Sequence, residues 1–152
     1  MNINRRQALA LSAGAAVVAV AGLGAAPALA TPEETQKRID EFAAGQAPQE
    51  GGKLTLVAPE IAENGNTVPI SVEVESAMSG DDIVQSVIIL AEGNPNPDVA
   101  TFNFSEASGV AAATTRMRLA KTQNVIALAK MKDGTVYIDK KEVKVTIGGC
   151  GG

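Results

Sequence analysis

Apolar and polar residues alternate along most of the chain after Lys53, with the period of two that is typical of half-buried β-strands. The clearest example covers residues 68–75, where four β-branched apolar residues alternate with a proline and with polar residues. Pro69 has no amide hydrogen to donate, so this strand is predicted to begin at or near a sheet edge. Residues 83–90 instead form a continuous apolar run, which predicts a central strand buried on both faces.

Shorter alternating segments lie at residues 53–56, 100–105, 115–119 and 143–147. Residues 125–131 and 135–138 flank Asp133-Gly134 and are predicted to form a β-hairpin. Turn signals separate these segments at Pro59, at Asn64-Gly65 and at residues 94–97. Seven or so short strands favour an all-β fold, an immunoglobulin-like antiparallel β-sandwich spanning residues 53–147. The Cys…Trp…Cys pattern of antibody domains is absent, and a β-barrel is the main alternative.

A helical pattern precedes the strands. Thr31 is a candidate N-cap, Pro32 suits the first helical position, and Glu34 lies three residues after the cap. The helix is predicted to run to about Ala44 and to end at Gly45, so that residues 31–45 form one element that docks through a single apolar stripe. Residues 46–52 are predicted to be a linker.

Residues 1–30 have the pattern of an export signal peptide. Arg5 and Arg6 precede a mildly apolar stretch at residues 8–26, and the small-x-small sequence at residues 28–30 predicts cleavage before Thr31. A transmembrane anchor is the alternative. The paired arginines resemble a twin-arginine signal, although Asn4 and Ala8 depart from that pattern, so the general secretory route stays open. Either route predicts a periplasmic protein.

Composition excludes several classes of function. Without Arg5 and Arg6 the chain holds 13 − 2 = 11 basic residues against 17 acidic ones, a net charge of −6. Such a charge disfavours nucleic acid and anionic membranes as partners. The chain has no histidine, which excludes Ser-His and Cys-His catalytic pairs, and one cysteine cannot build a zinc or iron–sulfur site. No metal or cofactor is therefore expected.

The only cysteine, Cys150, lies in the C-terminal sequence Gly148-Gly149-Cys150-Gly151-Gly152. Residues 148–152 contain no apolar residue that could bury the thiol, and glycine gives the backbone most freedom. An odd cysteine in an exported protein indicates intermolecular pairing or a free reactive thiol. Because nothing nearby would activate the thiol, we interpret the segment as a flexible arm that carries a group covalently for other enzymes. A structural intermolecular disulfide is the alternative, and a thiol enzyme is disfavoured.

The terminal pentapeptide, the segment at residues 58–70, the twin-arginine-like leader, Arg116-Met117-Arg118 and the Asp133-Gly134 hairpin together resemble the SoxY family. These proteins are the sulfur-carrier subunits of the periplasmic thiosulfate-oxidising Sox system. The resemblance covers the chain from Thr31 onward and implies an immunoglobulin-like sandwich in a heterodimer with SoxZ. It also implies that Cys150 carries sulfur intermediates and is not itself part of an enzyme.

The resemblance further implies which enzymes act on that cysteine. A haem c-containing enzyme, SoxAX, would join thiosulfate oxidatively to the thiol. A manganese-dependent hydrolase, SoxB, would release the terminal sulfone group as sulfate, and a sulfur dehydrogenase could oxidise the remaining sulfur.

Overall fold

The computed structural model describes residues 31–148. The signal-peptide prediction for residues 1–30, including Arg5 and Arg6, lies outside the described residues, as do Gly149, Cys150, Gly151 and Gly152. The described chain contains one α-helix, nine strands and one 3-10 helix: α2 (Pro32–Ala43), β1 (Gln49–Glu50), β2 (Leu54–Val57), β3 (Ile61–Asn64), β4 (Val68–Val74), β5 (Val84–Ala91), β6 (Asp98–Asn103), η1 (Glu106–Ser108), β7 (Ala111–Met117), β8 (Gln123–Met131) and β9 (Val136–Ile147).

The strands form two facing sheets. The larger has the order β1-β9-β8-β5-β6, with β3 also paired to β9, and the smaller has the order β2-β4-β7. Most neighbours are antiparallel, whereas β1 and β3 pair with β9 in parallel. The prediction of an immunoglobulin-like β-sandwich preceded by one helix is confirmed.

Helix α2 has the predicted capping box. The Thr31 hydroxyl accepts a hydrogen bond from the Glu34 amide at 3.2 Å, and the Glu34 carboxylate accepts one from the Thr31 amide at 3.0 Å. The helix ends at Ala43, and Ala44 adopts a left-handed conformation with φ 50°. Ile39 and Ala43 are buried on the face of the helix that packs on the sheet, as the single apolar stripe predicts.

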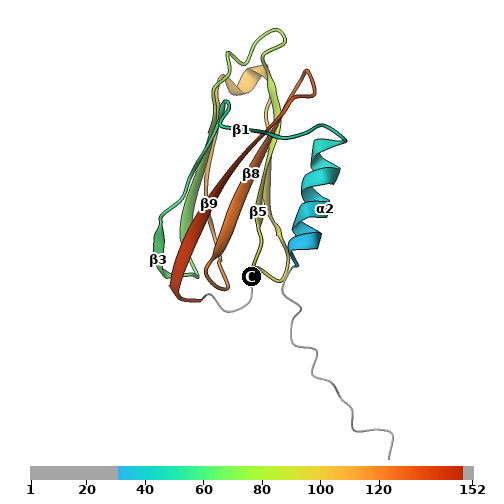
Figure 1. Ribbon diagram of the computed structural model, residues 1–152. Coiled ribbons are helices and arrows are strands. Elements are labelled where there is room, and N and C mark those ends of the chain that lie inside the picture. The colour runs from blue at the N-terminus through green and yellow to red at the C-terminus, as the bar shows by residue number, and fades with distance from the viewer. Residues whose placement is uncertain (1–30, 149–152) are drawn as a thin grey trace, which may run out of the picture.

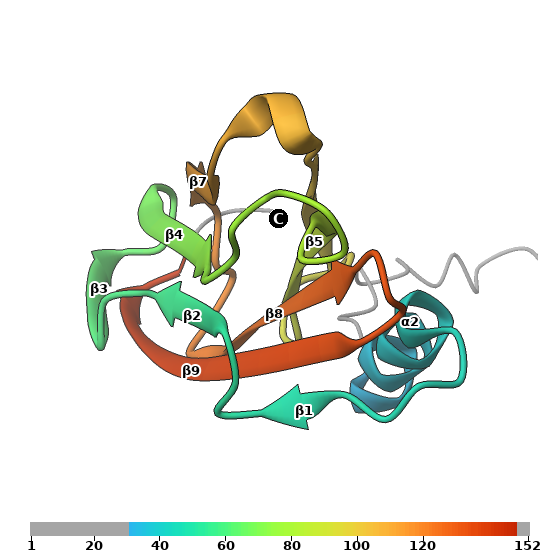
Figure 2. The ribbon, with the colours of Figure 1, turned by 90° about the horizontal axis from the view of Figure 1, so that it is seen from above.

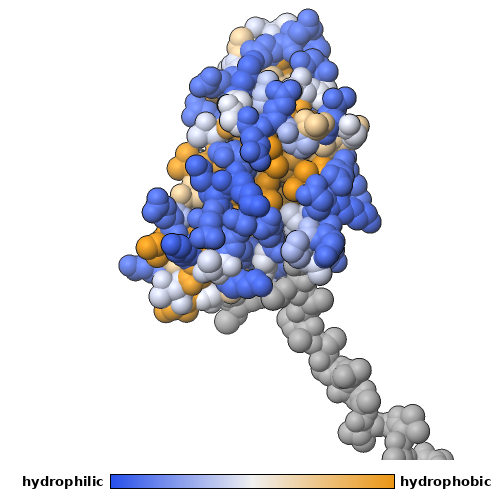
Figure 3. All heavy atoms as spheres, viewed as in Figure 1, coloured by the Kyte–Doolittle hydropathy of each residue, from blue (hydrophilic) through white to orange (hydrophobic). Residues whose placement is uncertain are grey.

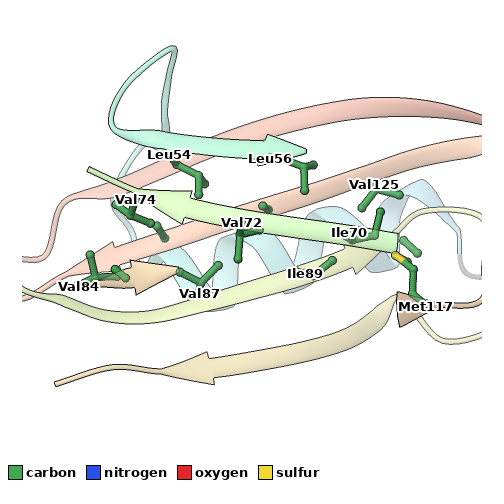
Figure 4. Packing of buried hydrophobic residues seen from close by; sticks show 14 of the residues in the cluster. Leu54, Leu56, Ile70, Val72, Val74, Val84, Val87, Ile89, Met117 and Val125 are labelled. Carbon is green, nitrogen blue, oxygen red and sulfur yellow. The ribbon is translucent and has the colours of Figure 1, made fainter. Parts of the chain in front are cut away.

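The core has two layers, because side chains of the central strands alternate between the faces of the large sheet. Between the sheets, Ile70 and Val72 of β4 meet Val87 and Ile89 of β5 (Figure 4). On the other face, Ile39 of α2 belongs to a second cluster with residues of β5, β8 and β9. The larger sheet thus lies between α2 and the smaller sheet (Figure 2). The two-sided burial predicted for residues 83–90 is confirmed by β5.

The prediction that the strand containing Pro69 begins at or near a sheet edge holds for its first residues but not for the strand as a whole. Strand β4 is the middle strand of its sheet, with β2 on one side and β7 on the other. The register shows why proline is tolerated: β2 pairs only as far as Ser71, so its side of β4 is open at Pro69, which lies opposite Arg116 of β7. The missing amide donor therefore leaves the pairing with β2 intact.

Three further details were not predicted. Residues 46–52, interpreted as a linker, contain the two-residue strand β1, and residues 61–64 form β3. Residues 135–138 and 143–147, treated as separate segments, belong to the single strand β9.

No helix in the part of the chain that the structure describes is long and apolar enough to cross a membrane. Polar residues cover most of the face seen in Figure 3, with apolar atoms visible between β9 and α2.

Candidate functional site

The segment that carries Cys150 follows the C-terminal end of β9 in the sequence. Figure 1 shows that this end of β9 lies at the same end of the sandwich as the beginning of α2. The Ile147 carbonyl accepts a hydrogen bond from the Gly65 amide at 2.7 Å, and the Gly65 carbonyl accepts one from the Leu119 amide at 2.8 Å. The end of β9, the turn after β3 and the connection from β7 to β8 are thus joined by backbone bonds.

Gly148 lies directly against the connection from β7 to β8. A Cβ atom built on Gly148 would be 2.3 Å from the Ala120 carbonyl oxygen, closer than real Cβ contacts. The φ angle of Gly148 is not in the left-handed region, so the backbone conformation alone does not demand glycine. The close approach to the Ala120 carbonyl oxygen is what requires glycine at this position. Gly148 therefore has a packing role that the interpretation as part of a flexible arm did not include.

A buried amide pair holds the connection that Gly148 contacts. Asn94 is only 4% exposed. Its Nδ2 donates to the Arg118 carbonyl at 2.8 Å, and its Oδ1 accepts from the Ala120 amide and from Gln123 Nε2, both at 3.0 Å. Gln123 Oε1 in turn accepts from the Gly93 amide at 2.7 Å. Every polar atom of the Asn94 side chain has a partner, so the position of residues 118–120 is strongly determined.

A hollow of about 300 Å³ opens next to this connection. Its lining comes from the loop after β5, the start of β6 and the end of β7, and includes Asn96, Asp98, Arg116 and Arg118. Both arginines are exposed, whereas Met117 between them is buried. Arg116 lies in β7 and Arg118 directly after its end, and the alternation of exposure continues from the strand into this residue, so both arginines lie on the outward side.

The acidic and the basic side chains that line the hollow differ in whether they form a salt bridge. Asp98 accepts hydrogen bonds from Arg38 Nε of α2 through both carboxylate oxygens, each at 3.0 Å. Arg38 also contacts Glu41 at 2.7 Å, and these two acidic partners, Glu41 first, raise the pKa of the Arg38 guanidinium. No salt bridge involves Arg116 or Arg118 within residues 31–148.

The other shifted ionisable groups lie around the loops at the opposite end of the sandwich. The Lys53 ammonium contacts Asp82 at 2.7 Å, and this hydrogen bond and one from the Ala77 amide lower the pKa of the Asp82 carboxyl. Hydrogen bonding from Thr135 lowers the pKa of Asp133 in the β8–β9 hairpin. These carboxylates accept hydrogen bonds that hold the loops in place, and the same hydrogen bonds stabilise the charged form and so lower the pKa. The lowered pKa values therefore reflect a structural role.

The structure places one of the predicted site residues, Gly148, at the end of β9. Cys150, Gly149, Gly151 and Gly152 lie outside the described residues, so their assignment as attachment point and arm stays a prediction. Among residues 31–148 no three Cys, Asp or Glu side chains are grouped as a metal site would require.

Asn94, Arg116 and Arg118 were not identified as site residues. The sequence pattern places the arginines on the polar side of a strand and within the residues that resemble the family, and it places Asn94 in a loop. Two arginines spaced by one residue at a strand end were the one available signal, because alternation alone places them on the same face. Nothing in the sequence indicated that Asn94, 24 residues from Arg118 in the chain, bonds to it.

Comparison with known proteins identifies relatives of the chain. Residues 39–150 match the family model described as sulfur oxidation protein SoxY. The sulfur carrier protein SoxY from Chlorobium limicola f thiosulfatophilum is 35% identical, with a TM-score of 0.59 over 74% of this chain and 98% of that one. No match to a curated protein was found.

Two superoxide reductases show a similar fold. A superoxide reductase (neelaredoxin) from Ignicoccus hospitalis has 19% identity and a TM-score of 0.53, over 76% of this chain and 92% of that one. A putative superoxide reductase from Thermotoga maritima has 16% identity and a TM-score of 0.51, over 64% of this chain and 93% of that one. At these identities the likeness concerns the fold alone.

Proposed function

Since the chain belongs to the SoxY family, we propose that it is a covalent sulfur carrier of thiosulfate oxidation, with Cys150 as the attachment point. The observation that carries the proposal is the family match itself, because the matched residues 39–150 include the only cysteine. The protein whose structure is 35% identical is described as a sulfur carrier.

The geometry at the end of β9 supports a carrier. The last described residues are exposed, and Ile147 is 66% exposed although it is a large apolar residue. Cys150 follows only two residues after Gly148, so its Cα atom is within about 7 Å of a fixed point on the surface of the fold, and the side chain of the cysteine adds to this reach. A carrier needs such an attachment: a rigid body that partners recognise and a short segment that they can take into their own active sites.

The chemistry of the proposed cycle balances when the partner enzymes supply the oxidant and the water. In loading, the thiol loses its proton and thiosulfate is attached: Cys–SH + S₂O₃²⁻ gives Cys–S–S–SO₃⁻ + H⁺ + 2 e⁻, with the electrons passing to the haem c-containing SoxAX enzyme. In hydrolysis by the manganese-dependent SoxB enzyme, Cys–S–S–SO₃⁻ + H₂O gives Cys–S–SH + HSO₄⁻. The chain itself provides the thiol and no catalytic group, so we propose that it is not an enzyme.

The remaining parts of the proposal concern partners and location. The carrier would form a heterodimer with a SoxZ-type subunit, and a sulfur dehydrogenase would oxidise the sulfur that stays on Cys150. Residues 1–30 would direct export through Arg5 and Arg6 and be removed, so that the protein functions in the periplasm.

The test is mass spectrometry of the intact protein after incubation with thiosulfate and the partner enzymes. We expect an adduct of one S₂O₃ group on Cys150, converted by the hydrolase into an adduct of one sulfur atom. Cys150→Ser should abolish both adducts and thiosulfate-dependent electron transfer, while the circular dichroism spectrum and the heterodimer stay unchanged. A stable disulfide-linked homodimer that thiosulfate and the enzymes leave unaltered would refute the carrier and support a structural disulfide.

A further inference from the structure

We propose that Asn64 is a site of spontaneous chemical modification, at which the Gly65 amide nitrogen attacks the Asn64 side chain and an isoaspartate forms. The hydrogen bond from the same amide to the Ile147 carbonyl, at the end of β9, controls the rate of this reaction. The reaction requires water and no enzyme. It is separate from the proposed carrier function, because it involves neither the cysteine nor sulfur.

The sequence supplies the reacting pair. Asn64-Gly65 is the only Asn-Gly sequence in the chain. Glycine has no side chain to hinder the approach of its nitrogen to the preceding side chain, which favours ring closure at this pair. In the first step, the Gly65 nitrogen loses its proton and bonds to the side-chain carbonyl carbon of Asn64, and ammonia leaves, which gives a cyclic succinimide. In the second step, water opens the ring at either carbonyl and gives isoaspartate or aspartate.

The structure exposes one reacting group and restrains the other. Asn64 is exposed, and its Oδ1 accepts a hydrogen bond from the Asn66 amide at 2.9 Å, a donor that would stabilise the charge that attack places on this oxygen. Gly65 is buried, and its amide donates to the Ile147 carbonyl at 2.7 Å. The base that must remove the amide proton is therefore kept away from it while this hydrogen bond is intact.

The strand adds a second restraint. Asn64 is the last residue of β3 and lies opposite Ile147 in the parallel ladder with β9. A residue in a parallel strand has a ψ angle of about +115°, which keeps its Cβ and the next nitrogen apart across the Cα–C bond. The five-membered ring requires these two atoms to be nearly eclipsed. Opening of the end of β3 from the end of β9 removes both restraints, so this local opening is the step that permits the reaction.

The product would weaken the contacts that slow its own formation. Isoaspartate continues the backbone through the former side chain, which adds a methylene group before Gly65 and shifts this residue relative to its partners. Gly65 joins the end of β9 to the connection between β7 and β8, because its carbonyl also accepts from the Leu119 amide at 2.8 Å. We therefore expect modification of Asn64 to release the end of β9 from this connection.

The experiment compares two reactions that remove the same proton from the purified protein. The chain is incubated in mildly alkaline buffer, once folded and once unfolded in guanidinium chloride. Peptide mass spectrometry follows the replacement of the Asn64 amide by a carboxylate, and an isoaspartyl methyltransferase assay detects isoaspartate. Hydrogen exchange of the Gly65 amide in the folded chain, measured by NMR, gives the protection that local opening must overcome.

We expect folding to slow the modification by the protection factor of the Gly65 amide, to within a few-fold. A reaction equally fast in the folded and unfolded chains would overturn the control by the hydrogen bond. A slowing that instead matches the protection of the Leu128 amide, in β8 between β5 and β9, would require global unfolding and would overturn it too. Absence of modification at Asn64 in the unfolded chain would overturn the site itself.

Two matched variants identify the reacting residue. Asn64→Gln cannot form the five-membered ring and should lose both the mass change and the isoaspartate. Asn66→Gln makes the same change at an exposed residue two positions later, leaves Asn64-Gly65 in place, and should react as wild type does. Modification that persists in Asn64→Gln would assign the reaction to another residue and overturn the proposal.

A third variant tests the effect of the product. The deamidated chain is isolated by ion exchange, and its isoaspartyl form is compared with Asn64→Asp, which has the same charge and a normal backbone. Exchange of the Gly65 and Leu119 amides should be several-fold faster in the isoaspartyl form. Equal exchange in the two would contradict the release of the end of β9.

Discussion

Replacing Gly148 with alanine tests whether the glycine is required for contact or only for flexibility. The added Cβ would lie 2.3 Å from the Ala120 carbonyl oxygen, against 3.4–4 Å for an ordinary van der Waals contact. The neighbouring atom is backbone, held by the hydrogen bond from the Ala120 amide to Asn94. The contact must therefore be relieved by about 1 Å of backbone movement.

Two ways of relieving the contact lead to a similar cost. If the strand stays in place, overpacking of this kind costs about 1–3 kcal/mol. If the end of β9 moves away, the hydrogen bond from the Gly65 amide to the Ile147 carbonyl is lost, and the one from the Leu119 amide to the Gly65 carbonyl is weakened. Each contributes about 0.5–1.5 kcal/mol. The expected destabilisation is therefore about 1–2 kcal/mol.

The measurement combines urea unfolding with amide hydrogen exchange. The free energy of unfolding should fall by the amount above, and exchange of the Gly65 and Leu119 amides should accelerate by about tenfold for each 1.4 kcal/mol. Thr146→Ala, which shortens an exposed side chain on the same strand end, is the control and should change neither. Wild-type stability and wild-type protection at both amides in Gly148→Ala would show that the glycine is present for flexibility alone.

Three further predictions concern other parts of the molecule. Asn94→Ala leaves several buried backbone and side-chain partners unsatisfied and should cost about 3 kcal/mol by urea unfolding, whereas Asn94→Asp should recover little of the loss. Because contacts lower the pKa of Asp82 in the folded chain, its carboxylate stabilises the fold above its ordinary pKa, and this contribution declines as the pH falls through the lowered pKa. Asp82→Asn should therefore be less stable than wild type at neutral pH and equal to it in acid, and a constant difference at every pH would contradict the role of the contact with Lys53. Gly149→Val and Gly151→Val should retain the reactivity of the thiol toward a small maleimide but lower enzyme-dependent loading, and equal losses in both assays would exclude an obstruction specific to the enzymes.

Local patterns were sufficient to predict most of the architecture. The capping box at Thr31, the alternation in β4, the apolar run in β5 and the Asp133-Gly134 hairpin each depend on neighbouring residues, and each was found where expected. Local chemistry determines such features, because a cap or a two-residue turn is complete within a few positions.

The features that could not be predicted from the sequence depend on contacts between residues that are far apart in the chain. Strand β3 consists of four residues and gains its partner from β9, more than 80 positions later. The tolerance of Pro69 in a middle strand depends on where β2 stops, which its own sequence does not indicate. The packing role of Gly148 is known only once Ala120 is placed, and the charge of the hollow only once Arg38 is seen to engage Asp98.

The position of β9 has a mechanical consequence. This strand pairs with β8 along Val136–Val143 on one side and with β1 and β3 on the other, and the segment bearing Cys150 continues from its end. Hydrogen bonds of a ladder lie across the strands, so a pull along β9 loads many of them together in shear rather than one after another. In the proposed carrier, a partner enzyme that pulls on this segment would therefore exert tension on it without peeling the strand from the sheet.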